Sequence, residues 1–191
     1  IGILGSRENI LKAKLEILEG MNDKGVLVLN GDNDLLKTVK TDLKQVTFGL
    51  ESGNDIVATD IKMVGEKTIC KIENNEIEIP VMGEVFVYNA LAAYAVGKLF
   101  SLTPEEIKNG IASFQMSNNR MNTIKTTKFT IINDTYNANP DSVKSAIKTL
   151  GTFKNRKVAI LGDMLELGEN EIKYHQEIGE FCNEKIDVLI T

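Results

Sequence analysis

The hydrophobic positions of the first thirty residues predict a helix followed by a buried strand. Ser6 can cap a helix over about residues 7–21, and Glu8 stands in its first turn, where a negative charge is favourable. The continuous apolar run at residues 25–30 leads into the polar sequence GDND at residues 31–34, which is typical of a strand that ends in a loop. This succession of helix and strand indicates an α/β protein.

Between residues 47 and 87 the pattern changes to short strands. Residues 68–72 and 77–79 are two of them, and the pair Asn74 and Asn75 between them suits a tight hairpin turn.

Two helices are predicted after these strands. The first covers residues 88–100, which are rich in Ala and Leu. The second begins at TPEE, residues 103–106, and extends to about residue 114, because this sequence supplies a capping threonine, a proline in the first helical position and a glutamate in the third.

The polar segment at residues 115–122 has no periodicity, and we place a domain junction there. One partial domain then covers residues 1–119 and a second covers residues 120–191. Beyond the junction the order is strand, helix, strand, helix, strand, which predicts a parallel sheet with right-handed connections. These elements are predicted at residues 129–133, 141–150, 157–161, 169–182 and 188–190.

The composition narrows the classes of function. The 22 Lys and Arg are scattered and are outnumbered by 27 Asp and Glu, which argues against a nucleic-acid surface because such a surface needs clustered cations. Cys70 and Cys182 lie far apart and outside any metal-binding spacing, so we expect free thiols, as in a reducing cytoplasm. No apolar run approaches the roughly 20 residues that span a bilayer, and we expect no membrane span. Because the chain starts at Ile1 without a Met and stops in a strand-like run, we also expect a piece of a longer protein.

A group of polar side chains follows the first predicted strand of the second part. Asp134 comes directly after this strand, and Tyr136, Asn137 and Asn139 follow it. Open parallel sheets bind ligands beyond the carboxyl ends of their strands, so these groups could contact a ribose or a phosphate. The simpler interpretation is a strand-to-helix turn in which Asn139 caps the next helix and Pro140 occupies its first position.

A second loop, GDMLELG at residues 162–168, follows the next predicted strand. It brings Asp163 and Glu166 to the same edge of the sheet, which suggests a site, although both charges could instead complement the start of the following helix. His175, the only histidine, lies on a stripe with Ile172 and small residues. That position fits a packed, hydrogen-bonded histidine at least as well as a catalytic one.

Two basic residues each allow two interpretations. Lys14 interrupts an apolar face of the first predicted helix, where a buried amine would be reactive; if the neighbouring stripe of Leu11 and Leu15 forms the core face, Lys14 extends to solvent. Arg120, in the junction, is solvated by default but is also suited to meet a phosphate. The phosphate loop G-x-x-x-x-G-K-[ST] does not occur in the sequence, so nucleotide chemistry would have to obtain it from elsewhere.

Several segments resemble the Mur ligase family, and specifically its MurF branch. The two that are specific to this branch are NDTYNANPDS at residues 133–142 and LGDMLELG at residues 161–168, with His175 downstream. The similarity covers nearly the whole chain. Segments that resemble the second half of the family's central domain are GSRENI at residues 5–10, NGD at residues 30–32 and NALAA at residues 89–93.

The resemblance implies the second half of a central ATPase domain followed by the start of a Rossmann-like C-terminal domain. It implies an ATP-dependent amide ligase of peptidoglycan synthesis, in which ATP phosphorylates the carboxylate of UDP-N-acetylmuramoyl-tripeptide. The amine of D-alanyl-D-alanine then displaces phosphate, and magnesium screens the transferring charge. The full-length enzyme is expected to be a cytoplasmic monomer.

The same resemblance assigns roles to individual residues. Lys14 matches a lysine that, once carbamoylated, helps to hold magnesium. Asn89 and Arg120 match positions that contact the nucleotide, and Asp134 matches the aspartate that meets the ribose. The remaining candidates are Tyr136, Asn137 and Asn139 in the Asp134 loop, and Asp163, Glu166 and His175 on the dipeptide side or in domain structure.

Two stretches depart from the family pattern. The family usually has G-x-H-N-V-x-N where this chain has GEVFVYN at residues 83–89, so Val85 and Phe86 replace a histidine and an asparagine near the adenine. Residues 1–5 lack the histidine and the acidic residue that usually precede Gly-Ser. Since the phosphate loop is also missing, we expect the chain on its own to be inactive.

Two functions remain as alternatives to a MurF-like ligase. One is another amide ligase of the superfamily, such as a folylpolyglutamate synthase, against which the loop at residues 134–141 speaks. The other is a non-catalytic module that binds a nucleotide or a partner, which is consistent with Val85 and Phe86. Upstream sequence that contains or lacks Gly-Lys-Thr would separate this module from the ligase.

Overall fold

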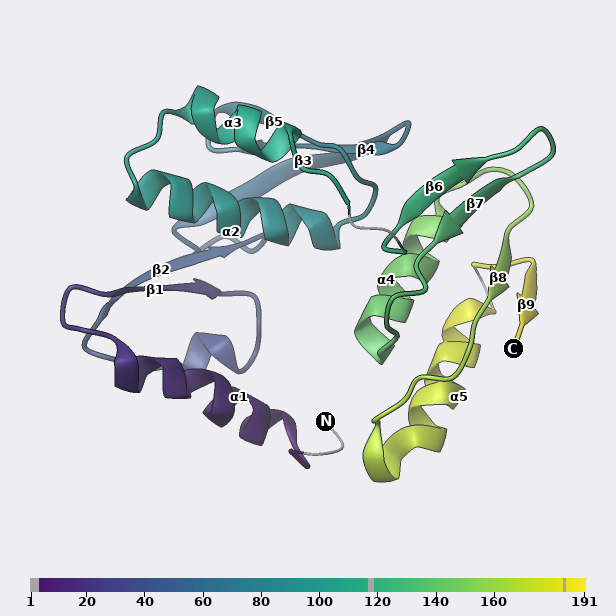
Figure 1. Ribbon diagram of the computed structural model, residues 1–191, viewed down its shortest axis with the longest axis horizontal. Coiled ribbons are helices and arrows are strands. Elements are labelled where there is room, and N and C mark those ends of the chain that lie inside the picture. The colour runs from purple at the N-terminus through teal and green to yellow at the C-terminus, as the bar shows by residue number, and fades with distance from the viewer. Residues whose placement is uncertain (1–3, 117–118, 184) are drawn as a thin grey trace. The chain divides into compact units, whose positions relative to one another are not determined.

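The computed structural model describes residues 4–116, 119–183 and 185–191, which form two compact units (Figure 1). The N-terminal unit comprises residues 7–115, and the C-terminal unit comprises residues 116–191 with the opening residues up to Ser6. Part of the opening stretch that departs from the family, residues 1–3, lies outside the described residues, as do residues 117 and 118 of the predicted junction. Within the described ranges, no helix is long and apolar enough to cross a membrane.

A five-stranded sheet in the order β1-β2-β3-β4-β5 organises the N-terminal unit. The first three strands are parallel, and β4 and β5 continue the sheet in antiparallel pairs. The strands predicted at residues 25–30, 68–72 and 77–79 are confirmed as β1, β4 and β5. The strands are β1 (Val26–Asn30), β2 (Lys44–Gly49), β3 (Ile56–Val64), β4 (Lys67–Ile72) and β5 (Asn75–Ile79).

The hairpin between β4 and β5 turns one residue earlier than predicted. Ile72 pairs with Asn75, so the loop residues are Glu73 and Asn74. Glu73 has a φ of 54°, a left-handed conformation that is unfavourable for a residue with a side chain. Its carboxylate accepts a hydrogen bond from the Tyr94 hydroxyl at 3.1 Å and pairs with Lys98, and these contacts hold the turn in place.

The helices of the N-terminal unit begin where the sequence places local start signals. The helix predicted over residues 7–21 is α-helical only to Leu15 and continues as a 3-10 turn. The predicted cap at Thr103 is confirmed, because its hydroxyl accepts the Glu106 amide and the Glu106 carboxylate accepts the Thr103 amide at 2.7 Å. The elements are α1 (Arg7–Leu15), η1 (Glu16–Gly20), η2 (Leu36–Thr38), α2 (Val85–Leu99) and α3 (Pro104–Ala112).

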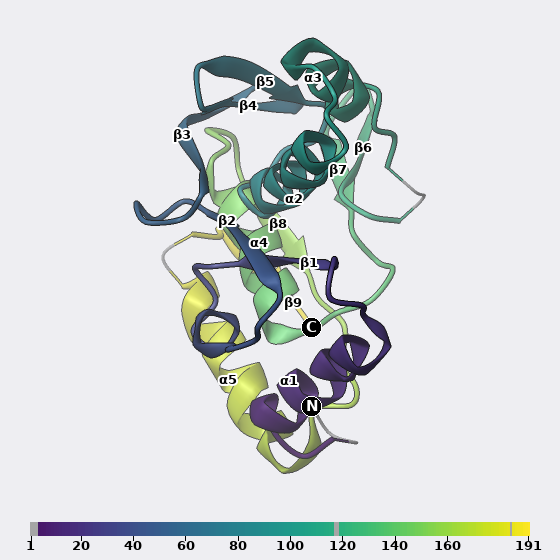
Figure 2. The same ribbon diagram turned by 90° about the vertical axis from the view of Figure 1, so that its left-hand side faces the viewer.

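Helix α2 contacts all five strands and supplies much of the hydrophobic core, and α3 packs against α2 and β5 (Figure 2). The fully or nearly buried residues of α2 recur at helical spacing and pack against the buried side chains of β3, β4 and β5. Gly97 allows the two helices to approach closely, because a Cβ there would lie 2.7 Å from Ile107 Cγ1. The buried residues of α2 are Val87, Ala90, Leu91, Tyr94, Ala95 and Gly97.

In its described residues, the C-terminal unit contains two small sheets, two α-helices and a short 3-10 helix. The predicted parallel arrangement is confirmed for β8 and β9, in which Ala159 lies opposite Leu189. In the part of the chain that the structure describes, β7 pairs not with these strands but with β6, an antiparallel strand that the sequence analysis missed because residues 122–125 have no apolar run. The elements are β6 (Asn122–Lys125), β7 (Thr130–Asn133), α4 (Pro140–Gly151), β8 (Val158–Ile160), η3 (Gly168–Asn170), α5 (Glu171–Cys182) and β9 (Val188–Ile190).

Candidate functional site

The β6–β7 hairpin brings the start of the C-terminal unit against the loop that follows β7. Asn122 lies opposite Asn133, so the residues before β6 and after β7 meet at one end of the hairpin. The Met121 amide donates to the Asp134 carboxylate at 3.1 Å, and the Tyr136 amide donates to the Asn119 carbonyl at 3.0 Å. Two segments that are separate in sequence are thereby joined into one surface.

Arg120 stacks on Tyr136 at this end of the hairpin. The central carbon of the guanidinium lies 4.0 Å from the centroid of the phenol ring. Tyr136 is 64% exposed and Arg120 is also exposed, so the pair is accessible to a ligand. A cation–π contact leaves the N–H groups of arginine available as donors. The structure thus brings together three of the predicted site residues, Arg120, Asp134 and Tyr136.

The two predicted asparagines of this loop have structural contacts. The Asn139 side chain accepts the Ser142 amide at 3.0 Å, and the Ser142 hydroxyl accepts the Asn139 amide at 3.1 Å, which forms a complete capping box at the start of α4. The Asn137 side chain accepts the Ala138 amide at 3.0 Å. The predicted strand-to-helix turn with Asn139 as its cap is therefore confirmed, and the side-chain oxygen of each asparagine is engaged.

The loop after β8 buries two apolar side chains and presents its acids to solvent. Met164 and Leu167 are 2% and 5% exposed and belong to the same hydrophobic cluster as Ile147, against which Ala138 of the first loop also packs. Asp163 and Glu166 are exposed. Both loops therefore rest on one small core. Neither acid lies in the first turn of α5, which begins at Glu171, so the helix-complementing interpretation does not apply to them.

His175 holds this second loop to α5. Its Nε2 accepts the Met164 amide at 3.0 Å, and its Nδ1 lies 2.9 Å from the Glu171 carbonyl oxygen. Because one ring nitrogen must accept while the other donates, these contacts fit the neutral imidazole with its proton on Nδ1. The predicted stripe of Ile172, His175, Gly179 and Cys182 is buried only at its C-terminal end, since Cys182 is 3% exposed whereas Ile172 is 74% exposed.

Lys14 is exposed on α1, so its interpretation as a buried, reactive amine is wrong. The alternative stripe is the partly covered one, because Leu11 and Leu15 are half-buried. Among the described residues there is no group of three or more His, Cys, Asp or Glu placed to hold a metal ion.

Asn89 is exposed near the start of α2, on the face that it shares with Val85 and Phe86. The start of the helix has no side-chain cap, and Glu84 in the capping position has helical backbone angles. Val85 is 44% exposed, whereas Phe86 packs partly against the core. The two residues that depart from the family pattern therefore give this face an apolar character beside Asn89.

Asp32, which was not among the predicted site residues, is the centre of a polar cluster at the carboxyl ends of β1 and β2. Its carboxylate accepts the Leu50 amide at 2.5 Å, the Asn54 side-chain amide at 2.7 Å and the Tyr88 hydroxyl at 2.9 Å. Burial opposes ionisation of Asp32, but these hydrogen bonds and one from the Glu51 amide outweigh it and lower the pKa of its carboxyl. The signal in the sequence was NGD at residues 30–32.

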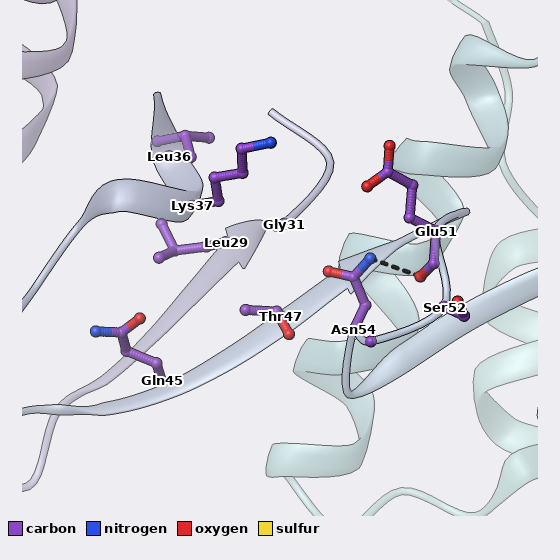
Figure 3. Close-up of a pocket in the computed structure, with 10 residues that line it drawn as sticks. Leu29, Gly31, Leu36, Lys37, Gln45, Thr47, Glu51, Ser52 and Asn54 are labelled. Carbon is purple, nitrogen blue, oxygen red and sulfur yellow. Dashed lines mark hydrogen bonds between the residues drawn. The ribbon is translucent and has the colours of Figure 1, made fainter. Parts of the chain in front are cut away.

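Two glycines make this cluster possible. A Cβ at Gly49 would lie 2.2 Å from the Asp32 carboxylate, and one at Gly31 would lie 1.9 Å from the Asn54 side-chain oxygen. Beside the cluster is a hollow of about 220 Å³ whose lining includes Lys37, Thr47 and Asn54 (Figure 3). The Asn54 amide also donates to the Glu51 carbonyl at 2.9 Å at the edge of this hollow.

Comparison with known proteins identifies a separate family domain in each part of the chain. Residues 1–97 match the family model of the Mur ligase middle domain, and residues 119–191 match that of the Mur ligase glutamate ligase domain. The UDP-N-acetylmuramoyl-tripeptide--D-alanyl-D-alanine ligase of Bacillus subtilis is 39% identical over 98% of this chain and 42% of its own length.

Solved structures of MurF proteins are similar to this chain over nearly its whole length, in agreement with the family match. MurF from Acinetobacter baumannii is 26% identical and has a TM-score of 0.90 over 100% of this chain and 48% of that one. MurF from Thermotoga maritima, solved in complex with ADP, is 26% identical and has a TM-score of 0.85 over 97% of this chain and 49% of that one. The chain spans less than half the length of these relatives. On the strength of the matched domains, the chain belongs to the Mur ligase family.

Proposed function

We propose that the whole protein to which this chain belongs is an ATP-dependent ligase of peptidoglycan synthesis that joins D-alanyl-D-alanine to UDP-N-acetylmuramoyl-tripeptide. The observation that carries this proposal is the 39% identity, over 98% of the chain, to the Bacillus subtilis ligase of that name. A phosphoryl group passes from ATP to the tripeptide carboxylate, and the amine of the dipeptide displaces phosphate as the amide bond forms. The full-length enzyme acts as a monomer in the cytoplasm.

Arg120, Asp134 and Tyr136 are the proposed nucleotide contacts of the C-terminal unit. Asp134 uses one oxygen to accept the Met121 amide, and a carboxylate has enough lone pairs to accept ribose hydroxyls as well. The stacked Arg120 supplies N–H donors for phosphate. The ADP bound to the similar Thermotoga maritima protein supports a nucleotide here.

The N-terminal unit contributes Asn89 and Lys14 to the proposal. Asn89 has the exposure that a nucleotide contact requires. Lys14 is accessible to carbon dioxide, and its carbamate would supply an oxygen ligand of the kind that magnesium prefers. The described residues hold no complete metal site, so one lysine would complete a set of ligands supplied from elsewhere in the enzyme.

The loop at residues 162–168 is the proposed dipeptide side. Asp163 and Glu166 present carboxylates to solvent, and His175 fixes the loop that carries them. Asn137 and Asn139 shape the first loop through their backbone contacts, and their side-chain NH₂ groups are the part that would face a ligand.

The test is phosphate release by the full-length enzyme with ATP, magnesium and both substrates. Release that requires the tripeptide and the dipeptide together is expected, and calorimetry should detect no tight ATP binding by residues 1–191 alone. Asp134→Asn keeps an oxygen for the Met121 amide but removes the charge, and we expect it to raise KM for ATP. Asp141→Asn, an exposed acid in the first turn of α4, is the matched control and should leave KM for ATP unchanged.

An absence of phosphate release under these conditions would refute the ligase proposal. Tight nucleotide binding without turnover would then support the non-catalytic module. Equal effects of Asp134→Asn and Asp141→Asn would remove Asp134 from the proposed nucleotide site while leaving the ligase assignment standing.

A further inference from the structure

The first turn of α2 lacks the side-chain cap that usually holds the start of a helix in place. A helix start without a side-chain cap is less stable, although the Phe86 and Val87 amides donate to the Gly83 and Glu84 carbonyls at 3.1 and 3.0 Å. Gly83, just before the helix, has a φ of 124°, and its amide donates to the Thr68 hydroxyl at 3.1 Å. Val87, with 0% exposure, anchors the core side of this turn. These contacts fix the helix start on the side of β4 and the core.

A third contact is made with the loop that follows β1. The Tyr88 hydroxyl donates to Asp32 at 2.9 Å, a hydrogen bond between residues that are 56 positions apart in sequence. Asp32 is itself held by the Leu50 amide and by Asn54, so its position is fixed by the loop between β2 and β3. The bond therefore connects the first turn of α2 to a rigid point at the carboxyl edge of the parallel strands.

Asn89 is the next residue along the helix. A hydrogen bond at Tyr88 limits both the rotation of the first turn and its movement along the helix axis, and Asn89 moves with that turn. Because a misplacement of about 1 Å weakens a contact that needs defined geometry, the orientation of Asn89 depends on this tether.

We propose that Tyr88 is a positioning residue for the nucleotide, and that its hydrogen bond to Asp32 holds Asn89 in the orientation that the nucleotide requires. This inference rests on the proposed ligase function. Tyr88 itself need not touch the nucleotide.

The experiment compares two phenol-to-phenyl variants on the same helix in the full-length enzyme. Tyr88→Phe removes the tether and keeps the ring. Tyr94→Phe removes a hydroxyl that donates to the Glu73 carboxylate at 3.1 Å and accepts from Asn75, so it also costs hydrogen bonds, but two turns away from the helix start. For Tyr88→Phe we expect KM for ATP to rise roughly 3- to 10-fold, the range of one hydrogen bond, with kcat changed less than about twofold. For Tyr94→Phe we expect KM for ATP to stay at the wild-type value.

Amide hydrogen exchange supplies a readout that does not need catalysis. Exchange at residues 85–89 should be faster in Tyr88→Phe than in the wild type, and unchanged there in Tyr94→Phe. Equal KM values for the two variants would overturn the proposal, because they would show that Tyr88 contributes only to stability. If the wild-type enzyme itself releases no phosphate, the ligase proposal fails, whereas unchanged exchange at residues 85–89 in Tyr88→Phe refutes the tether independently.

Discussion

The two hydrophobic cores contain one free cysteine each, which allows the stability of each unit to be measured separately. Cys70 is 0% exposed in the core of the N-terminal unit, and burial raises the pKa of its thiol to about 11. Cys182 is 3% exposed in the core of the C-terminal unit, and burial raises the pKa of its thiol as well. A thiol reagent reacts with the thiolate, so each cysteine should react only when its own core opens.

Leu91→Ala should increase the reactivity of Cys70 and leave Cys182 unchanged. Leu91 is fully buried in the cluster that contains Cys70. Truncation of a buried leucine to alanine costs about 2–5 kcal/mol, and a loss of about 3 kcal/mol raises the population of the open state roughly 150-fold. The labelling rate of Cys70 should rise by the same factor, as long as closing is faster than labelling.

Ile178→Ala is the reciprocal change. Ile178 is 5% exposed and shares its cluster with Cys182, so this variant should accelerate labelling of Cys182 and spare Cys70. Labelling is followed by mass spectrometry of the two cysteine peptides at a fixed pH near 8. If either variant accelerates both cysteines equally, the two cores open as one unit and the reasoning from separate clusters is wrong.

Three further predictions follow from the hydrogen bonds of individual side chains. Asn139→Ala should lower the free energy of unfolding of the C-terminal unit by about 1 kcal/mol, because it removes the cap that accepts the Ser142 amide. Asn139→Asp should keep most of that free energy, because aspartate also caps helices, and chemical denaturation of both variants measures the difference. Equal losses in the two variants would contradict the capping role. Asp32→Asn should destabilise the N-terminal unit by about 2 kcal/mol at pH 7. Because the fold lowers the pKa of Asp32 below its ordinary value of 3.8, the difference in unfolding free energy between wild type and variant should be complete above pH 3.8 and should vanish as the pH falls through the folded pKa. A difference in unfolding free energy that persists in acid would contradict the role of the ionised carboxylate. His175→Ala should speed hydrogen exchange of the Met164 amide, and His175→Gln should partly restore protection by offering an oxygen as acceptor; identical exchange in the two variants would argue against the hydrogen bond.

The features that could be predicted from the sequence are those set by neighbouring residues. The caps at Thr103 and Asn139 form as predicted, and each is completed as a capping box by a side chain three positions further on. The buried strand β1 follows from one continuous apolar run. Local chemistry of this kind leaves little room for alternatives.

The features that were missed depend on contacts between distant residues. β6 has no apolar run of its own and exists because β7 pairs with it. The stacking of Arg120 on Tyr136 follows from that pairing, which brings together residues 16 positions apart. The Asp32 cluster joins residues that are 18, 22 and 56 positions from it, and no periodicity within one segment could reveal it.

The position of Lys14 illustrates a different limit. Two adjacent stripes on a short helix were each compatible with the apolar pattern, and their difference is a rotation of one residue. No residue of α1 is fully buried, so packing imposes only a weak preference between them. Helical periodicity alone could not decide which face a helix with so little burial would present.

The core of the N-terminal unit has a consequence for the synthesis of the protein. The buried members of its main cluster lie between Phe48 and Ile111 in sequence, and the buried Leu27 and Leu29 of β1 precede them. During translation, all of these side chains have therefore been added before the first residue of β6. The N-terminal unit can form its core while the C-terminal unit is still being made, because domains generally fold as units from the N-terminus onward. The order of translation thus shortens the time during which the unfolded core residues of both units are exposed together.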